Sequence, residues 1–371
     1  MNCLIRGKWT SIGFYVRESP WRSPTVARYL CTGTDKVRTF PVTYLTETIG
    51  LSPESAISVS KRLCFKTADR PDAVVAMFRD HGFSQTQIQT IVMRCPVLLD
   101  LSAEKNLLPK LEFFYSKGAS TSCLTQLVSG FPSVLSASLE NRLVPSFELL
   151  RGLLDSEEEI FRAMQRFAGL LNPDQLARNV QCLKECGMPD AKIQLLICKQ
   201  PRTMITNVDK FRDTVEEVIK MGFNPKTTRF VLALSTLRSL SKTTLEEKGD
   251  VLRKWGWSEE ELSAAFKRRP GYMRASDKKI TAVMDYLVNK LHFRPSTVAK
   301  CPLMLSYSLK GRIIPRASVA QALISKGLLK KELSLSLFIS AEKLFLQKYV
   351  LAHEKEVPDL LKVYTDSIGK P

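Results

Sequence analysis

Residues 82–96, GFSQTQIQTIVMRCP, contain the start and stop signals of one α-helix. Gly82 suits the left-handed backbone position that closes a preceding helix. Ser84 is a good cap for the next helix, and Gln87 three residues later completes a capping box. Pro96 ends that helix, because proline has no amide donor and clashes with the preceding turn. The stretch therefore predicts a helix that begins after Ser84 and stops before Pro96.

The same spacing recurs along the chain, which predicts a helical repeat. Glycine and proline stand fourteen residues apart in four copies, Gly82 to Pro96, Gly118 to Pro132, Gly187 to Pro201 and Gly256 to Pro270. The cap position of the other copies holds Ser120, Pro189 with Asp190, Asn224 with Pro225 at the first helical position, and Ser258. The third residue after each stop is apolar and is predicted to pack the turn onto the core: Leu99, Leu135, Met204, Met273 and Leu305.

Three weaker copies complete the array. Ala168 occupies one proline slot, with Leu154 in its glycine slot, and Thr236 occupies another, while Pro302 ends a short copy with His292 for the glycine. The seven stops lie 32 to 36 residues apart, which is typical of solenoids. One helix pair cannot bury its own apolar face, so the copies must stack. We predict an all-α, right- or left-handed superhelical solenoid of about seven repeats.

The first forty residues differ in composition from the repeats. They carry seven Lys or Arg against Glu18 and Asp35, with scattered Ser and Thr and no continuous apolar region. This is typical of an organelle transit peptide and not of a secretory signal. The arginine content favours the mitochondrion, with the chloroplast as the alternative, and a plain disordered tail is the other interpretation. The predicted domains are a transit peptide at 1–40, a repeat solenoid at 41–330 and a C-terminal helical cap at 331–371, with Phe345, Tyr349 and Leu360 on the apolar face of the cap.

The charge of the chain points to an anionic partner. The formal net charge is +18, and residues 1–40 account for +5 of it, so the repeats retain +13. Five of the seven copies carry a cation two residues before the stop. In a regular solenoid these cations form a stripe, which suits a phosphate backbone. Together with neighbouring cations, the predicted phosphate contacts are Arg94, Arg166, Lys199, Arg202, Arg268, Arg269, Lys300, Arg312 and Arg316. The alternative is that cations at helix C-termini compensate the helix dipole and the unpaired carbonyls without any ligand.

Signatures of catalysis and of metal binding are missing from the sequence. It contains no glycine-rich phosphate loop, no paired-histidine metal motif and no nucleophile elbow. Cys182 and Cys186 are one helical turn apart, but the three histidines are widely separated, so a four-ligand zinc site is not expected. No run of about eighteen apolar residues predicts a membrane span. We therefore predict a protein that is not an enzyme and has no cofactor or metal.

Several motifs together resemble the mitochondrial transcription termination factor (mTERF) family, particularly its land-plant branch. They are GLSPE at 50–54, DHGFS at 80–84, WGWSE at 255–259, CPLMLSYSL at 301–309, RIIPR at 312–316 and EVPDLL at 356–361. The resemblance implies a superhelix of repeats, each with two α-helices and a short 3₁₀ turn, that binds nucleic acid along a positive groove in mitochondria or plastids. It also implies a role in transcription termination or regulation, with intron splicing or ribosome assembly as alternatives. Ala168, Thr236 and His292 depart from the family pattern.

The sequence leaves other functions and partners open. Double-stranded DNA and RNA are both compatible with a basic stripe that contacts phosphates. A protein-interaction scaffold is the competing class, because solenoids also present broad surfaces to helices and peptides. A capped solenoid can be a monomer, which is the oligomeric state that we predict.

Overall fold

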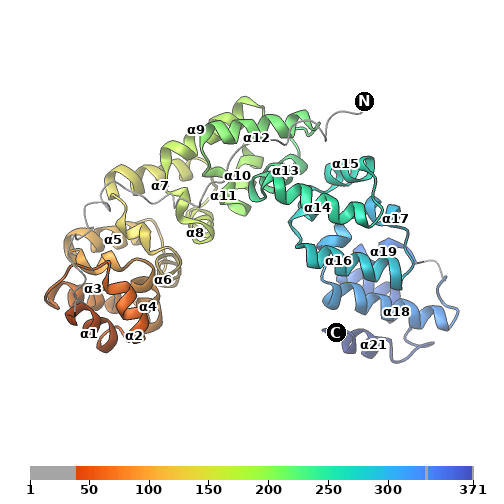
Figure 1. Cartoon of the computed structure of the whole chain (residues 1–371), viewed down its shortest axis with the longest axis horizontal. Helices are drawn as coiled ribbons and strands as arrows, with labels where there is room; N and C mark the ends of the chain where they lie inside the picture. The colour runs from red at the N-terminus through yellow and green to blue at the C-terminus, as the bar shows by residue number, and fades with distance from the viewer. Residues whose placement is uncertain (1–38, 331–332, 370–371) are drawn as a thin grey trace. The chain divides into compact units, whose positions relative to one another are not determined.

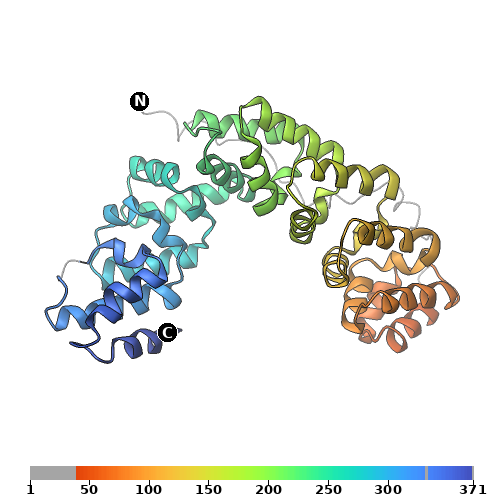
Figure 2. The same ribbon diagram turned by 180° about the vertical axis from the view of Figure 1, so that it is seen from behind.

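The computed structural model describes residues 39–330 and 333–369, and within these ranges it contains helices and no strands. The predicted transit peptide lies outside the described residues except for Thr39 and Phe40, which already belong to the first helix. The chain divides into two compact units between Asp213 and Thr214. Each unit is a stack of helix pairs, and the pairs follow one another in chain order (Figures 1 and 2). The predicted all-α repeat solenoid is thereby confirmed.

The helices of the first unit form five pairs. In order, the pairs are α1 (Thr39–Glu47) with α2 (Pro53–Ser60), α3 (Asp69–Asp80) with α4 (Gln85–Arg94), α5 (Leu108–Ser116) with α6 (Thr121–Gly130), α7 (Val144–Arg151) with α8 (Glu157–Arg166), and α9 (Pro173–Glu185) with α10 (Asp190–Lys199). The second helices pack on one another, α2 on α4, α4 on α6, α6 on α8 and α8 on α10. They therefore form a continuous layer, because each helix pair buries its apolar face against its neighbours.

The second unit continues the pattern. Helix α12 (Val208–Lys220) contains the division between the units and is followed by α13 (Thr228–Ser239). The later pairs are α14 (Lys242–Lys254) with α15 (Glu259–Arg268), α16 (Asp277–Asp285) with α17 (Pro295–Lys300), and α18 (Ile314–Ser325) with α19 (Leu335–Ile339). The chain then forms α20 (Glu342–Phe345) and α21 (Leu360–Asp366). Helix α15 packs against both α13 and α17.

The start signals act as predicted in most copies. Ser84 and Ser258 each form a capping box, with Gln87 and Glu261 as the reciprocal partners. The prediction for Asn224 is wrong, because α13 begins at Thr228 and its cap is the hydroxyl of Thr227.

The stop prolines begin short 3₁₀ turns as well as ending helices. The turns are η2 (Pro96–Asp100), η4 (Pro132–Ser136), η7 (Pro270–Arg274) and η9 (Pro302–Ser306). The copy with Ala168 forms η6 (Ala168–Leu170), and Pro201 begins the short helix α11 (Pro201–Met204). The residues predicted to pack these turns onto the core are all buried, with Leu99, Leu135, Met204 and Leu305 fully enclosed and Met273 only 7% exposed. The copy with Thr236 differs, because α13 runs through this position to Ser239 and no 3₁₀ turn follows.

The glycine slot defines more helix pairs than the seven copies that we predicted. Gly82 has a φ of 79°, in the left-handed region that closes a helix, and His292 adopts a φ of 58° in the equivalent slot. Gly50 and Gly327 have the same conformation at the junctions of α1 with α2 and of α18 with the segment that leads to α19. The described residues therefore contain one further pair at each end of the predicted array.

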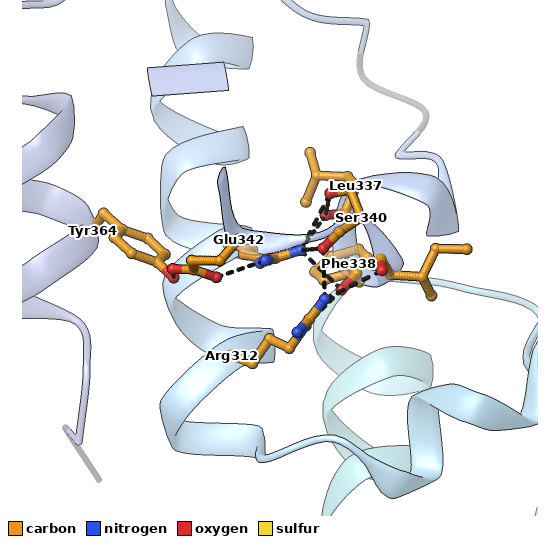
Figure 3. Close-up of polar contacts among 8 residues, drawn as sticks. Arg312, Leu337, Phe338, Ser340, Glu342 and Tyr364 are labelled. Carbon is orange, nitrogen blue, oxygen red and sulfur yellow. Dashed lines mark hydrogen bonds and ion pairs between the residues drawn. The ribbon is translucent and has the colours of Figure 1, made fainter. Parts of the chain in front are cut away.

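A buried arginine holds residues 333–369, which we call the C-terminal cap. Arg316 is fully buried, and its Nη1 donates to the carbonyls of Leu337, Phe338 and Ser340 at 2.8 to 3.0 Å. Its Nη2 pairs with Glu342 at 2.7 Å. The second oxygen of Glu342 accepts a hydrogen bond from Tyr364 of α21 (Figure 3). This network joins α18, the end of α19 and α21, and the apolar residues Phe345, Tyr349 and Leu360 are buried there as predicted.

The Glu342 carboxylate makes the stability of the cap depend on pH. Partial burial acts to raise the pKa of Glu342, but the hydrogen bonds from Tyr364 and Arg316 outweigh it and hold the pKa below its usual value. A carboxyl whose pKa is depressed by folding stabilises the protein above the pKa of the unfolded chain, roughly 4.3, and loses this contribution as the pH falls through the folded value. We expect the difference in unfolding free energy between the wild type and Glu342→Gln to be constant above about pH 5.5 and to shrink below about pH 4. Denaturant titrations at each pH measure this difference, and a constant difference down to pH 3 would contradict it.

Candidate nucleic-acid interface

Two of the second helices carry a run of acidic residues at their start and basic residues at their end. Helix α8 begins with the acidic run at residues 157–159 and ends with Arg166, and α15 begins with the run at 259–261 and ends with Lys267 and Arg268. Both arrangements complement the helix dipole. Because consecutive second helices pack side by side, their C-terminal ends lie along one side of each stack. We call the cations there the basic edge; its members are Arg62, Arg94, Arg166 and Lys199 in the first unit and Arg268, Arg269 and Lys300 in the second.

Two members of the basic edge, Arg94 and Arg268, each bond to the last two carbonyls of the second helix in the next pair. Nη1 of Arg94 donates to the carbonyls of Ser129 at 3.0 Å and Gly130 at 2.8 Å, which are the last two residues of α6. Nη1 of Arg268 donates to the equivalent carbonyls of α17, Ala299 at 3.4 Å and Lys300 at 2.7 Å. These bonds satisfy carbonyls that a helix end leaves unpaired. We call these two side chains the staple arginines.

Arg62 belongs to the basic edge but was missed in the sequence. Its Nη2 donates to the carbonyl of Met93, near the end of α4, at 3.1 Å. Counting fourteen residues from Gly50 reaches Cys64, and Arg62 stands two residues before it, the same place that Arg94 has relative to Pro96. Because position 64 is a cysteine and not a proline, the glycine–proline spacing did not identify this copy.

Four members of the basic edge have no side-chain hydrogen bond or ion pair to the described part of the chain. They are Arg166, Lys199, Arg269 and Lys300, and all four are exposed. Arg202, just beyond the edge, is also exposed and lies over the Phe167 ring, with its guanidinium carbon 5.4 Å from the ring centroid. The edge has gaps, because Gly130 has no side chain and Leu234 is fully buried in the corresponding slots. These free cations are the part of the edge that can contact an anion without first losing a partner.

Two predicted phosphate contacts do not belong to this surface. Arg316 is fully buried, so its prediction as a phosphate contact is wrong: its donors are already used inside the cap. Arg312 is half-buried; its Nε donates to Phe338 and its Nη2 donates to Ile339 and Ser340. Its guanidinium carbon also lies 4.1 Å from the centroid of the Tyr307 ring. Both arginines therefore hold the C-terminal cap in place.

Further cations close individual repeats. Nζ of Lys110 donates to Leu135 at 2.5 Å, and Nε of Arg142 donates to Leu171 at 2.6 Å, so each joins the start of a first helix to the 3₁₀ turn of its own copy. Nζ of Lys279 makes the equivalent bond to Ser306 at 2.7 Å. Burial lowers the pKa of both Lys110 and Arg142. Part of the positive charge of the chain thus belongs to side chains that hold the helices of a repeat together.

Two other kinds of site concern residues 39–330 and 333–369, a metal centre and a membrane span. No group of three His, Cys, Asp or Glu side chains in these ranges is arranged to hold a metal ion, and Cys182 is buried. None of the described helices combines the length and the apolar character that crossing a membrane requires.

The fold and the basic edge together define a helical-repeat protein with regularly placed exposed cations. The family model described as mTERF matches residues 75–282 and 149–346, which together cover most of the chain, and the chain therefore belongs to the mTERF family. The chain is also similar to transcription termination factor MTERF8, chloroplastic, of Arabidopsis thaliana, with 22% identity over 261 residues. That alignment covers 68% of this chain and 51% of the relative, so the chain spans about half the length of this relative.

Proposed function

We propose that this protein binds nucleic acid in an organelle and regulates gene expression there, with transcription termination among its roles. Membership of the mTERF family supports the class of function, and the Arabidopsis relative is named as a transcription termination factor of the chloroplast. The protein acts by binding and not by catalysis, as a monomer. The arginines of residues 1–40 favour the mitochondrion, and the name of the relative favours the chloroplast. Imaging of the full chain fused to a fluorescent protein distinguishes the two organelles.

The observation that carries the proposal is the recurrence of exposed cations without a partner in the described chain, one or two residues before the stop of a repeat. Arg166, Lys199, Arg269 and Lys300 do not need to break a hydrogen bond or an ion pair within the described chain to reach a phosphate. Phosphate contacts of this kind are independent of sequence and position the protein on a nucleic acid. Arg94, Arg268 and Arg202 supply additional positive charge beside them.

The test is binding to a mixed-sequence DNA duplex, a single-stranded RNA and a structured RNA across about 50 to 200 mM salt. We expect steep salt dependence for the preferred polymer. Replacing Arg166, Lys199, Arg269 and Lys300 together by glutamine should weaken binding about tenfold or more at 100 mM salt and lower the slope by up to ~0.9 for each lost contact on duplex DNA. The matched control changes four exposed lysines outside the edge to glutamine, Lys326, Lys343, Lys355 and Lys362. An equal loss in the control variant would show that net charge, and not the edge, drives binding.

The polymer that the protein prefers also distinguishes among the roles that we consider. A preference for duplex DNA supports transcription regulation, and a preference for structured RNA supports intron splicing or ribosome assembly. A protein-interaction scaffold is the second candidate, because Leu344, Leu351 and Leu361 of the C-terminal cap are 54%, 52% and 49% exposed. If the chain binds none of the three polymers at low salt, the scaffold replaces the nucleic-acid function.

A further inference from the structure

The staple arginines have the same bonding pattern although they lie in different units. In Arg94 and in Arg268, Nη1 donates to the last two carbonyls of the next second helix. Neither side chain has a further polar contact among the described residues, and both residues are exposed. Each guanidinium is thus bound to the protein through one nitrogen only.

The Nε and Nη2 donors of each guanidinium remain available to bind an anion. Nη1 carries two hydrogens, and two carbonyls accept them. The remaining donors are Nε and Nη2, whose N–H bonds point in parallel along one side of the planar group. This is the fork that binds two oxygens of a phosphate or carboxylate at once. A lysine in the same place has only a single terminal nitrogen and offers no such fork.

The staples also hold these forks in place before any ligand binds. The side chain of Arg94 starts from α4 and is fixed at its tip by the end of α6, and that of Arg268 is fixed between α15 and α17 in the same manner. A long side chain that is already ordered loses less conformational entropy on binding. The carbonyls are neutral partners, so the positive charge remains available to an anion.

We propose that Arg94 and Arg268 each bind one backbone phosphate on the Nε–Nη2 edge while Nη1 holds the next repeat, so that binding of a polyanion and stacking of the repeats stabilise each other. This inference rests on the proposed nucleic-acid function and adds a mechanism to it. A ligand that binds only the stapled arrangement stabilises that arrangement by mass action. The junctions of α4 with α6 and of α15 with α17 therefore become more rigid when the ligand binds. Arg166 and Arg269 differ, because they contribute charge without a staple.

The test replaces the staple arginines by lysine, which keeps the charge and removes the fork. We expect the double variant R94K/R268K to bind a mixed-sequence DNA duplex or RNA about tenfold more weakly at 100 mM salt, with the salt slope of the wild type. The matched control, R166K/R269K, should change the affinity less than about twofold, because these residues act as charges only. Hydrogen exchange supplies the second readout: in the wild type the ligand should slow exchange of the amides in the last turns of α6 and α17, and in R94K/R268K this slowing should be lost.

The outcomes separate this inference from the proposed function. If the wild type binds no polymer at low salt, the proposed function fails first. If the wild type binds and R94K/R268K keeps its affinity and its ligand-dependent protection of α6 and α17, the staple arginines are only structural and the inference is wrong. The single variants R94K and R268K each retain one staple, so a folded protein is available for the same comparison if the double variant does not fold.

Discussion

Replacing Arg316 with leucine should destabilise the second unit by about 3 kcal/mol or more, because the cation loses several hydrogen bonds to backbone carbonyls, each of which contributes about 1.5–3 kcal/mol. The substitution removes one donor from each of the carbonyls of Leu337, Phe338 and Ser340, and it removes the ion pair with Glu342. It also removes the cation that lies over the Phe345 ring, where the guanidinium carbon is 4.4 Å from the ring centroid. Denaturant unfolding measures the loss, and hydrogen exchange should locate it in α19, α20 and α21.

A matched substitution distinguishes the loss of a buried arginine from the loss of a positive charge alone. Arg294→Leu removes an exposed arginine of the same unit, and we expect it to change the unfolding free energy by no more than about 0.5 kcal/mol. Nucleic-acid binding provides a second comparison, because Arg316 is enclosed and its loss should not reduce the salt slope. A variant that stays as stable as the wild type but loses a phosphate contact would restore Arg316 to the interface and contradict its structural role.

Introducing the consensus proline should have opposite effects in the two copies that lack it. Thr236 lies inside α13, which continues to Ser239, so Thr236→Pro removes a helical hydrogen bond and clashes with the preceding turn. We expect Thr236→Pro to lower the free energy of unfolding by about 3 kcal/mol or more. Ala168 instead begins the 3₁₀ turn η6, and Phe167 before it is extended with φ −164° and ψ 95°, near the φ of −141° and ψ of 69° that Phe131 adopts before Pro132.

Ala168→Pro is therefore expected to be neutral or to stabilise the protein by up to about 1 kcal/mol, because proline restricts the unfolded chain. Thermal and denaturant unfolding of the two variants beside the wild type measure both effects. Equal stabilisation by the two prolines would mean that α13 shortens readily and that the copy with Thr236 can adopt the regular repeat.

Local signals were sufficient for most of the helix boundaries. The capping boxes at Ser84 and Ser258 formed because all the groups involved lie within one turn of the chain. The proline stops worked for the same reason, since the missing amide acts on the adjacent turn. The Asn224 prediction failed because Thr227, three residues further on, caps α13 instead, and the Asn224 side chain accepts a bond from the amide of Lys226.

The basic edge was only partly predictable. Its position in the repeat could be read from the cations two residues before five of the seven stops, but the sequence could not show which of them bond to a neighbouring repeat. Arg94 and Arg268 are separated from the carbonyls that they bind by about one repeat of chain. Arg316 could have been recognised, because Val319, Ala320 and Leu323 place it on the buried stripe of its own helix.

The helical repeat follows from the local sequence, because glycine, cap and proline act through bonds within a few residues. Tertiary structure decided which cations serve the fold and which remain free. That distinction depends on carbonyls that another helix presents, as α6 does for Arg94 and the end of α19 does for Arg316. A cation has the same local sequence signal whether it binds a helix end or a phosphate, because both are acceptors at the C-terminal side of a helix layer. Only the packing of one repeat on the next separates the two roles.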